Sequence, residues 1–280
     1  MKRSNKRIIP GFGLSMGVTV TLLSVIVLIP LASLVIFTAQ LSFSDIIAVI
    51  TRDRVLASFK VSFLTAFVAS LINAVMGVIL AWVLVRYDCP FKRILDGMIE
   101  LPFALPTAVA GIALTSLTAD KGIIGSFFAR FGIKIAYTRA GITVALVFIG
   151  IPFVVRAVQP VLEKLDSSLE EAASTLGASR SRTFRQVIFP EIMPAVFTGF
   201  GLAFGRCLGE YGSVVFIAGN QPFETEITPL IIMSELQEYD YASATAIALV
   251  MLAASFLILF LVNLIQVRNS KILRGGGKGA

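Results

Sequence analysis

The sequence predicts an all-α, polytopic membrane protein with six transmembrane helices. Apolar residues make up 56% of the 280 residues, charged residues make up only 15%, and the mean hydropathy is +0.88. A soluble domain of this size needs far more charge to cover its surface, so the composition is typical of a membrane protein. The apolar residues form runs long enough for helices to cross the roughly 30 Å hydrocarbon core of a bilayer.

Each predicted span is bounded by charged residues. In chain order, the spans are expected at about 14–37, between Lys60 and Arg86, between Glu100 and Asp120, from Arg139 to Val155, at about 192–219, and between Asp240 and Arg268. The first span is too long for the apolar region of a signal peptide, so we expect it to be retained. We divide the chain into a first span with its flanking segments (1–58), a core transmembrane domain (59–267) that contains a long loop (162–193), and a tail (268–280).

The basic residues predict the orientation of these spans. Sixteen lysines and arginines lie in the two termini and in the connections on the same side, whereas seven lie in the connections on the opposite side. Cytoplasmic segments of membrane proteins carry the excess of basic residues. Both termini and the loop 162–193 are therefore expected in the cytoplasm.

Several function classes lack the residues they need. The chain contains no histidine, which removes histidine-based catalysis and the common Cys/His zinc sites. Its two cysteines do not stand in a metal-ligand pattern, and no G-x-x-x-x-G-K-[ST] phosphate loop occurs. We therefore predict no catalytic residue, no metal site and no bound cofactor. The net charge of +7 is attributed to the orientation of the spans, so lipid and not nucleic acid is expected around the chain.

The first half of the loop 162–193 has the pattern of a short helix that ends at a glycine. Ser168 and Glu171 are spaced as a capping box, in which each side chain satisfies a backbone donor near the other. Leu169 and Leu176 would then share one helical face with Ala172 and Ala173. Gly177 is expected to end this helix, because glycine adopts a positive φ without steric cost.

The second half of the loop predicts another short helix. It is expected to start at Ser179 and to be closed by Pro190 and Pro194, which lead into the fifth span. Two helices with a hinge between them are typical of a docking element. An amphipathic connector that lies on the inner leaflet remains an alternative.

Two spans contain residues that are unusual inside a membrane. Arg206 and Glu210 lie in the fifth span at i, i+4 spacing and can form a pair, either for structure alone or with Arg206 also attracting an anion. Gly201, Gly205 and Gly209 form a stripe that predicts a close approach by another helix. In the third span, Pro102 and Pro106 are expected to interrupt backbone hydrogen bonding near one end, in a packing helix or beside a water-filled path.

The loop resembles the EAA loop of ABC-importer permeases. The pattern consists of an acid and two alanines, a glycine after three residues, and an apolar segment that ends in proline; its members here are Glu171, Ala172, Ala173, Gly177, Val187, Phe189 and Pro190. Val187 and Phe189 replace the isoleucine and leucine usual in the family and remain apolar. The resemblance implies a type I ABC-importer permease fold and a loop that couples the membrane domain to a separate ATPase.

Other segments are similar to oxyanion permeases. The stretch from Leu101 to Gly111 and the run 209–212, Gly-Glu-Tyr-Gly, are similar to segments that border the path in these proteins. The resemblance implies a translocation path near Pro102, Pro106, Thr107, Gly205, Arg206 and Glu210. Segments 149–162, 216–220 and 236–241 extend the resemblance over nearly the whole chain, and they favour the T-type permease subunit of sulfate/thiosulfate ABC importers.

This resemblance implies a complete transport assembly in a bacterial inner membrane. Its other parts would be a second homologous permease, an ATPase dimer that holds ATP and Mg²⁺, and a sulfate- or thiosulfate-binding protein. A permease for molybdate, tungstate or phosphate is an alternative, as are an anion channel, a secondary carrier and a membrane scaffold for an ATPase. The segment between the last two spans holds five acids and no basic residue, which argues against an open funnel for a free dianion.

Overall fold

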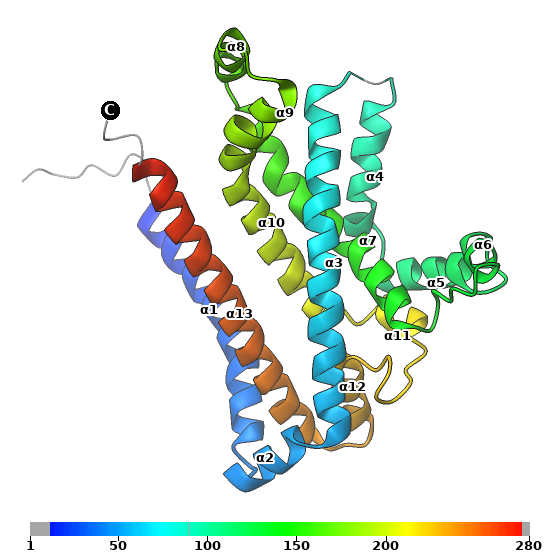
Figure 1. The fold of residues 1–280 in the computed structure, drawn as a ribbon. Coiled ribbons are helices and arrows are strands. Elements are labelled where there is room, and N and C mark those ends of the chain that lie inside the picture. Colours follow the sequence, from blue (N-terminus) through cyan, green and yellow to red (C-terminus); the bar gives the residue numbers. More distant parts are fainter. Residues whose placement is uncertain (1–11, 89, 276–280) are drawn as a thin grey trace, which may run out of the picture.

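The computed structural model describes residues 12–88 and 90–275, with side chains described up to Leu264 (Figure 1). All regular secondary structure in these ranges is helical. The helices are α1 (Phe12–Thr38), α2 (Phe43–Ile50), α3 (Asp53–Arg86), α4 (Lys92–Ala104), α5 (Thr107–Thr118), α6 (Ile123–Ala129), α7 (Arg139–Glu163), α8 (Ser167–Thr175), α9 (Arg180–Thr183), a π-helical turn (Phe184–Ile188), α10 (Phe189–Leu208), α11 (Val214–Ile217), α12 (Thr228–Gln237) and α13 (Tyr241–Gly275).

The prediction of an all-α polytopic membrane protein is confirmed. Within the described residues, five helical segments are long and apolar enough to cross a membrane: α1, α3, α7, the run Arg180–Leu208 and α13. The pair formed by α4 and α5 brings the number to six if it counts as one bent span. The start of α1 and the end of α13 lie at the same end of the molecule as α8, which matches the shared side expected for the termini and the loop (Figure 1).

The core is formed by α3, α7 and α10, which pack against one another along the molecule (Figure 1). Glycines allow this packing: a Cβ added at Gly77 would lie 2.6 Å from Cγ1 of Val154, and one at Gly199 would lie 2.8 Å from Cα of Val154. The predicted glycine stripe faces α13, because a Cβ added at Gly201 would lie 3.9 Å from Leu259 and one at Gly205 would lie 3.4 Å from it. A helix therefore does pack on the stripe as expected, at ordinary contact distance, and the tighter contact is made by Gly199.

The third span is a bent pair of helices and not a straight helix. The axes of α4 and α5 differ by 114° at a break formed by Leu105 and Pro106. Pro106 interrupts the helix as predicted, whereas Pro102 lies within α4, and the break is central because α4 already begins at Lys92. Arg156 of α7 holds the first half of the pair, since its guanidinium lies 2.8 Å from Asp96 and 2.7 Å from Glu100.

Several predicted span ends are wrong, because charges and prolines do not end these helices. The second span starts at Asp53, well before Lys60, and α7 continues beyond Val155 through Pro160 to Glu163. The fifth span breaks after Leu208, so α10 does not extend to residue 219. A charged side chain can find a partner or reach water from within a helix, so it is a weak helix terminator.

The prolines after the second loop helix do not close it, which corrects another expectation. The chain remains helical from Arg180 to Leu208, through Pro190 and Pro194. A proline ring clashes with the carbonyl four residues before it in a regular α-helix. Here the turn directly before Pro190 is π-helical, with the Phe189 N–H donating to the Phe184 carbonyl, and this wider turn accommodates the ring.

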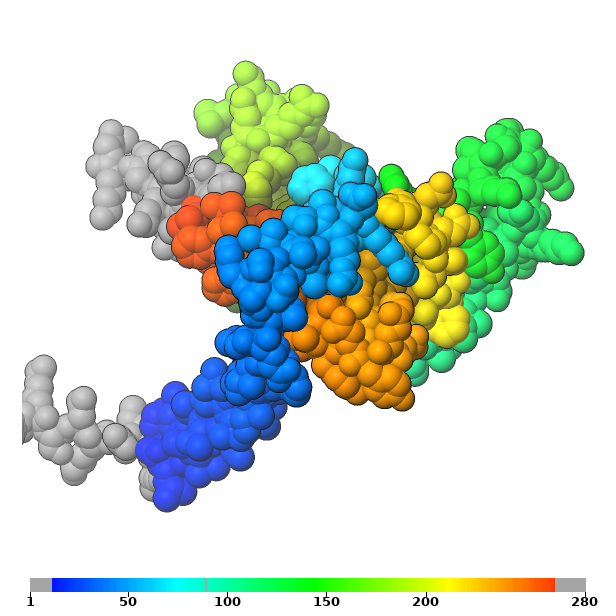
Figure 2. Space-filling view, turned by 90° about the horizontal axis from the view of Figure 1, so that it is seen from below, coloured from blue at the N-terminus to red at the C-terminus, as the bar shows by residue number. Residues whose placement is uncertain are grey.

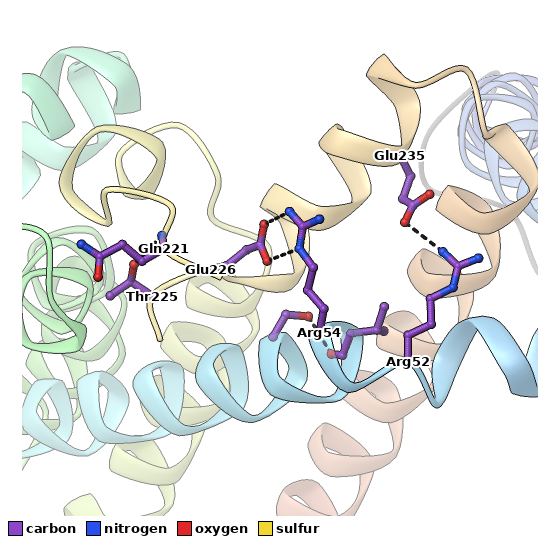
Figure 3. Close-up of polar contacts among 8 residues, drawn as sticks. Arg52, Arg54, Gln221, Thr225, Glu226 and Glu235 are labelled. Carbon is purple, nitrogen blue, oxygen red and sulfur yellow. Dashed lines mark hydrogen bonds and ion pairs between the residues drawn. The ribbon is translucent and has the colours of Figure 1, made fainter. Parts of the chain in front are cut away.

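The end of the molecule opposite α8 is built from α2, the start of α3, α12 and the segment 209–227, with α1 and α6 extending away on different sides (Figure 2). A bidentate ion pair connects α3 to the segment before α12 at this end. Nε and Nη2 of Arg54 donate to the two carboxylate oxygens of Glu226 at 2.8 and 2.6 Å (Figure 3). Arg52 pairs with Glu235 at 3.2 Å. Burial raises the pKa of Glu235, and the charge of Arg52 acts in the opposite direction.

These pairs weaken one sequence-based expectation. The acids between the last two spans were expected to repel a free dianion, but Glu226 and Glu235 are each neutralised by an arginine of the segment that begins α3 (Figure 3). Glu226 is buried, with 1% of its surface exposed. This end of the molecule is therefore less negative than the loop sequence indicates.

Candidate functional site

The loop 162–193, named the coupling loop below, contains the two helices that the sequence predicts. The first begins two residues earlier than expected, because Asp166 and not Ser168 is the N-cap residue of α8. Its carboxylate accepts a hydrogen bond from the Ser168 N–H at 2.9 Å. The predicted capping box of Ser168 and Glu171 is therefore wrong. Asp and Ser are comparable N-cap residues, so the sequence did not distinguish them. The hydrogen bond from the Ser168 backbone lowers the pKa of Asp166.

Gly177 ends α8 as predicted. Its φ is +77°, its N–H donates to the Ser174 carbonyl at 2.9 Å, and the Ala178 N–H donates to the Ala173 carbonyl at 3.0 Å. These two hydrogen bonds form a Schellman motif, which satisfies carbonyls at the end of a helix. Ser179 then caps α9, because its hydroxyl accepts from the Arg182 N–H. The glycine hinge between two capped helices is confirmed.

The apolar face of α8 has no partner within the described part of the chain. Leu176 is 88% exposed, Leu169 is 44% exposed, and no residue of α8 is buried. Glu171 and Ala172 are exposed, and Ala173 is half-buried. An exposed apolar face that projects from one end of a membrane protein is typical of a contact surface. It leaves the predicted pattern residues of α8 accessible to another protein.

The second half of the coupling loop is anchored in the membrane domain. Ile188 is buried with 2% exposure, and the ring of Phe184 meets the ring of Trp82 on α3 edge to face, with centroids 5.3 Å apart. Val187 and Pro190 are half-buried, and Phe189 is 37% exposed. The apolar residues of this half therefore pack partly against α3. Only part of their surface remains available to another protein.

Arg206 and Glu210 form the predicted pair. Nη1 of Arg206 donates to Oε2 of Glu210 at 2.6 Å. The other carboxylate oxygen of Glu210 accepts from the N–H of Ser213 at 2.8 Å and from its hydroxyl at 2.9 Å. We name these three residues the buried polar cluster. Ser213 was not identified from the sequence, although a serine three residues after a buried acid is a possible signal.

The two members of the pair differ in exposure. Glu210 is 2% exposed, whereas 34% of the Arg206 side chain is exposed. Glu210 also lies beyond Gly209, the C-cap of α10, so the chain has left the helix before it reaches the carboxylate. A buried carboxylate with three hydrogen bonds fixes the guanidinium on one side, while about a third of the arginine side chain stays exposed.

The structure brings the predicted residues of the third and fifth spans together. A Cβ added at Gly212 would lie 2.2 Å from Oγ1 of Thr107, and one at Gly111 would lie 2.5 Å from the Ser213 carbonyl oxygen. The start of α5, which follows Pro106, therefore packs directly on the segment that carries Glu210. Two other predicted residues lie elsewhere: Pro102 is buried within α4, and Gly205 faces Leu259 of α13.

The coupling loop and the buried polar cluster lie at opposite ends of one helical run. The run Arg180–Leu208 contains 29 residues, which corresponds to about 40 Å at 1.5 Å per residue. Its first turns belong to the coupling loop, and its last turn carries Arg206. A movement of the loop can therefore reach the cluster through a continuous helix.

We predict that Gly212→Ala separates α5 from the segment 209–213. The added methyl group would overlap the Thr107 hydroxyl at 2.2 Å, which real Cβ atoms do not tolerate. The expected result is a lower thermal stability of the purified protein. Thr107→Ala in the same chain should recover part of it, because it removes the overlapping oxygen.

Gly209→Ala is the matched control for this substitution. Its added Cβ would have the Gly205 carbonyl oxygen 4.0 Å away as its nearest neighbour, and its φ of −87° suits alanine. It should therefore behave like the wild type. An equal loss in Gly209→Ala and Gly212→Ala would show that the contact with Thr107 is unimportant.

Comparison with known protein families and sequences finds clear similarity. Residues 73–271 match the family described as binding-protein-dependent transport system inner membrane component. The chain is 51% identical over 272 residues to the sulfate transport system permease protein CysT of Salmonella typhimurium strain LT2, covering 97% of this chain and 98% of that protein. The protein of the same name from a Synechocystis species is 47% identical over 249 residues, covering 89% of this chain and 87% of that protein.

Two solved structures share the fold. A chain of a bacterial ABC transporter involved in the import of the acidic polysaccharide alginate matches with a TM-score of 0.75 at 15% identity, covering 91% of this chain and 94% of that chain. A chain of the inward-facing MetNI methionine ABC transporter matches with a TM-score of 0.55 at 17% identity, covering 79% and 94%. At these identities the likeness concerns the fold alone.

Proposed function

This chain belongs to the family of binding-protein-dependent transport system inner membrane components, and from that premise we propose that it is the membrane-spanning permease subunit of an ATP-driven importer of sulfate or thiosulfate. The similarity to sulfate transport permeases over almost the whole chain supports this substrate class. The fold predicted from the EAA pattern agrees with that of ABC-transporter permeases. The chain contributes the path through the membrane.

The observation that carries the proposal is the arrangement of the coupling loop. It exposes an apolar helix face at one end of the molecule, and one helical run connects it to the buried polar cluster. In the proposed mechanism, an ATPase dimer binds the face formed by Glu171, Ala172, Ala173 and Leu176. ATP and Mg²⁺ act in that dimer, whose closure on ATP moves the coupling loop, and α10 transmits the movement to the segment 209–213.

The buried polar cluster suits a path for an oxyanion. The Arg206 side chain is partly exposed, and the hydrogen bond to Glu210 keeps the arginine in place. A guanidinium recognises a tetrahedral dianion through paired N–H donors. In the proposed path, Arg206 meets the anion, and Thr107 and the start of α5 form the facing wall.

The proposed assembly contains further subunits. No residue of the most apolar window of α1 is buried within the described structure, and the face of α1 away from α13 is free to contact lipid or a second permease. A sulfate- or thiosulfate-binding protein would deliver its anion at the end that carries α12. By the excess of basic residues, the coupling loop and both termini face the cytoplasm of a bacterial inner membrane.

The test is sulfate uptake into vesicles that contain the chain, its partner permease and the ATPase, with the loaded binding protein outside. We expect ATP-dependent uptake that stops when the ATPase is omitted. We also expect that the isolated chain does not hydrolyse ATP above a mock preparation. Thiosulfate should compete with labelled sulfate, whereas stronger competition by molybdate or phosphate would assign the chain to another oxyanion.

A second measurement tests the docking face directly. A cysteine introduced at Ala172 should crosslink to the ATPase, because this position is exposed on α8. A cysteine at Ile123 is the control, since it is 82% exposed but lies on α6, far from α8 (Figure 1). ATP-independent uptake, or equal crosslinking at the two positions, would refute the proposed role of the coupling loop.

A further inference from the structure

An ion pair joins the coupling loop to the end of α3. Nη2 of Arg86 donates to Oε1 of Glu170, although the two residues are 84 positions apart in the chain. Arg86 lies in the last turn of α3, and Glu170 lies in the first turn of α8. A basic residue at a helix C-terminus and an acidic residue at a helix N-terminus are each stabilised by the helix dipole. The pair therefore connects two helix ends of opposite polarity.

Aromatic side chains support the arginine. The guanidinium carbon of Arg86 lies 5.4 Å from the centre of the Trp82 ring, a cation–π distance. The same tryptophan meets Phe184 edge to face, so Trp82 contacts both the arginine and the second half of the coupling loop. Nε of Arg86 is buried and has no hydrogen-bond partner. An arginine that has lost part of its hydration gains more from a carboxylate partner than a fully exposed one.

The first helix of the coupling loop has few other restraints. No residue of α8 is buried, and no atom lies within 4 Å of a Cβ added at Gly177, which joins α8 to α9. The angle of α8 to the membrane domain therefore needs a tether. Glu170 is half-buried and faces Arg86, whereas the adjacent Glu171 is exposed and has no ion-pair partner within the described residues.

We propose that Arg86 is a positioning residue that holds α8, through Glu170, at the angle needed to meet the ATPase. The two adjacent glutamates then have different tasks: Glu170 anchors the helix inside the chain, and Glu171 remains available to the partner. This inference rests on the proposed function, because it assumes that α8 contacts an ATPase. The tether itself does not depend on that assumption and can be measured without the ATPase.

The first experiment measures amide hydrogen exchange of α8 in the full chain, in lipid discs without the ATPase. Glu170→Gln should speed the exchange of α8 amides about threefold to tenfold, since a charge-assisted contact is lost. Glu171→Gln is the matched control, because it removes the same charge from the same helix and should leave the exchange unchanged. Equal exchange in the two variants would overturn the tether.

The second experiment measures the number of sulfate ions transported per ATP hydrolysed by the assembled complex. Arg86→Glu and Glu170→Arg should each lower this ratio severalfold, and the double variant should recover part of it by restoring an ion pair of reversed polarity. No recovery in the double variant would contradict the positioning role, as would faster α8 exchange with an unchanged ratio in Glu170→Gln. Failure of the proposed function is distinguishable, because the wild-type complex would then show no ATP-dependent transport.

Discussion

Replacing Gly177 by valine should abolish sulfate transport while the subunits still assemble. The glycine has a φ of +77°, and a Cβ added at this position would meet no atom within 4 Å. The substitution therefore causes no clash, and its cost is conformational. A residue with a Cβ loses roughly 1–2 kcal/mol in this region, and a β-branched residue is especially unsuited to it. We expect the Schellman motif to open and α8 to lose its angle to α9.

The measurement is transport and substrate-stimulated ATP hydrolysis by the reconstituted complex, which should fall together. Gly132→Val is the matched control, because Gly132 has a φ of +74° and likewise has no atom within 4 Å of an added Cβ. It imposes the same backbone strain between α6 and α7, away from the coupling loop. Normal coupling in Gly177→Val, or an equal defect in Gly132→Val, would show that the hinge has no special role.

Removing Arg206 should be one of the most damaging single substitutions in the chain. Arg206→Ala leaves the 2%-exposed carboxylate of Glu210 without its ionic partner. Breaking a buried ion pair by deleting one member costs about 3–5 kcal/mol. The remaining hydrogen bonds from Ser213 only partly compensate the charge. We therefore expect low thermal stability, poor assembly and no uptake in Arg206→Ala.

The double variant separates a structural pair from one that also serves the anion. Arg206→Ala/Glu210→Ala removes both charges and should recover part of the stability. If the arginine meets the anion, assembly returns but uptake does not, whereas a purely structural pair would give back uptake as well. Lys134→Ala is the control, because Lys134 and its partner Asp120 are 71% and 62% exposed, and exposed ion pairs contribute little. Wild-type stability in Arg206→Ala would contradict both interpretations.

Features that depend on neighbouring residues were predictable from the sequence. The glycine end of α8 and the serine cap of α9 follow from the conformations these residue types favour, and both are confirmed. The pair of Arg206 and Glu210 follows from its i, i+4 spacing. The family membership was also predictable, because the EAA pattern is a short run of residues with fixed spacing.

Local competition between equivalent residues produced the smaller errors. Asp166 and Ser168 are both good N-cap residues, and only the structure shows that α8 begins directly after Asp166. Pro190 was expected to end a helix, yet the π-helical turn before it lets the helix continue. The glycine stripe of α10 faces α13 as expected, but the tightest contact of this helix is that of Gly199 with Val154, which the sequence did not indicate. In each case the neighbouring backbone, and not the residue type, determined the outcome.

The sequence by itself determined that this protein is a helical membrane protein, which of its loops is structured, and to which family it belongs. The tertiary structure decided which distant residues meet: Thr107 with Gly212, Arg156 with the acids of α4, and Arg86 with Glu170. Apolar content and capping chemistry act over a few residues, so they can be read along the chain. A contact between residues far apart depends on the bend of 114° between α4 and α5 and on the crossing of α3, α7 and α10, which many side chains determine together.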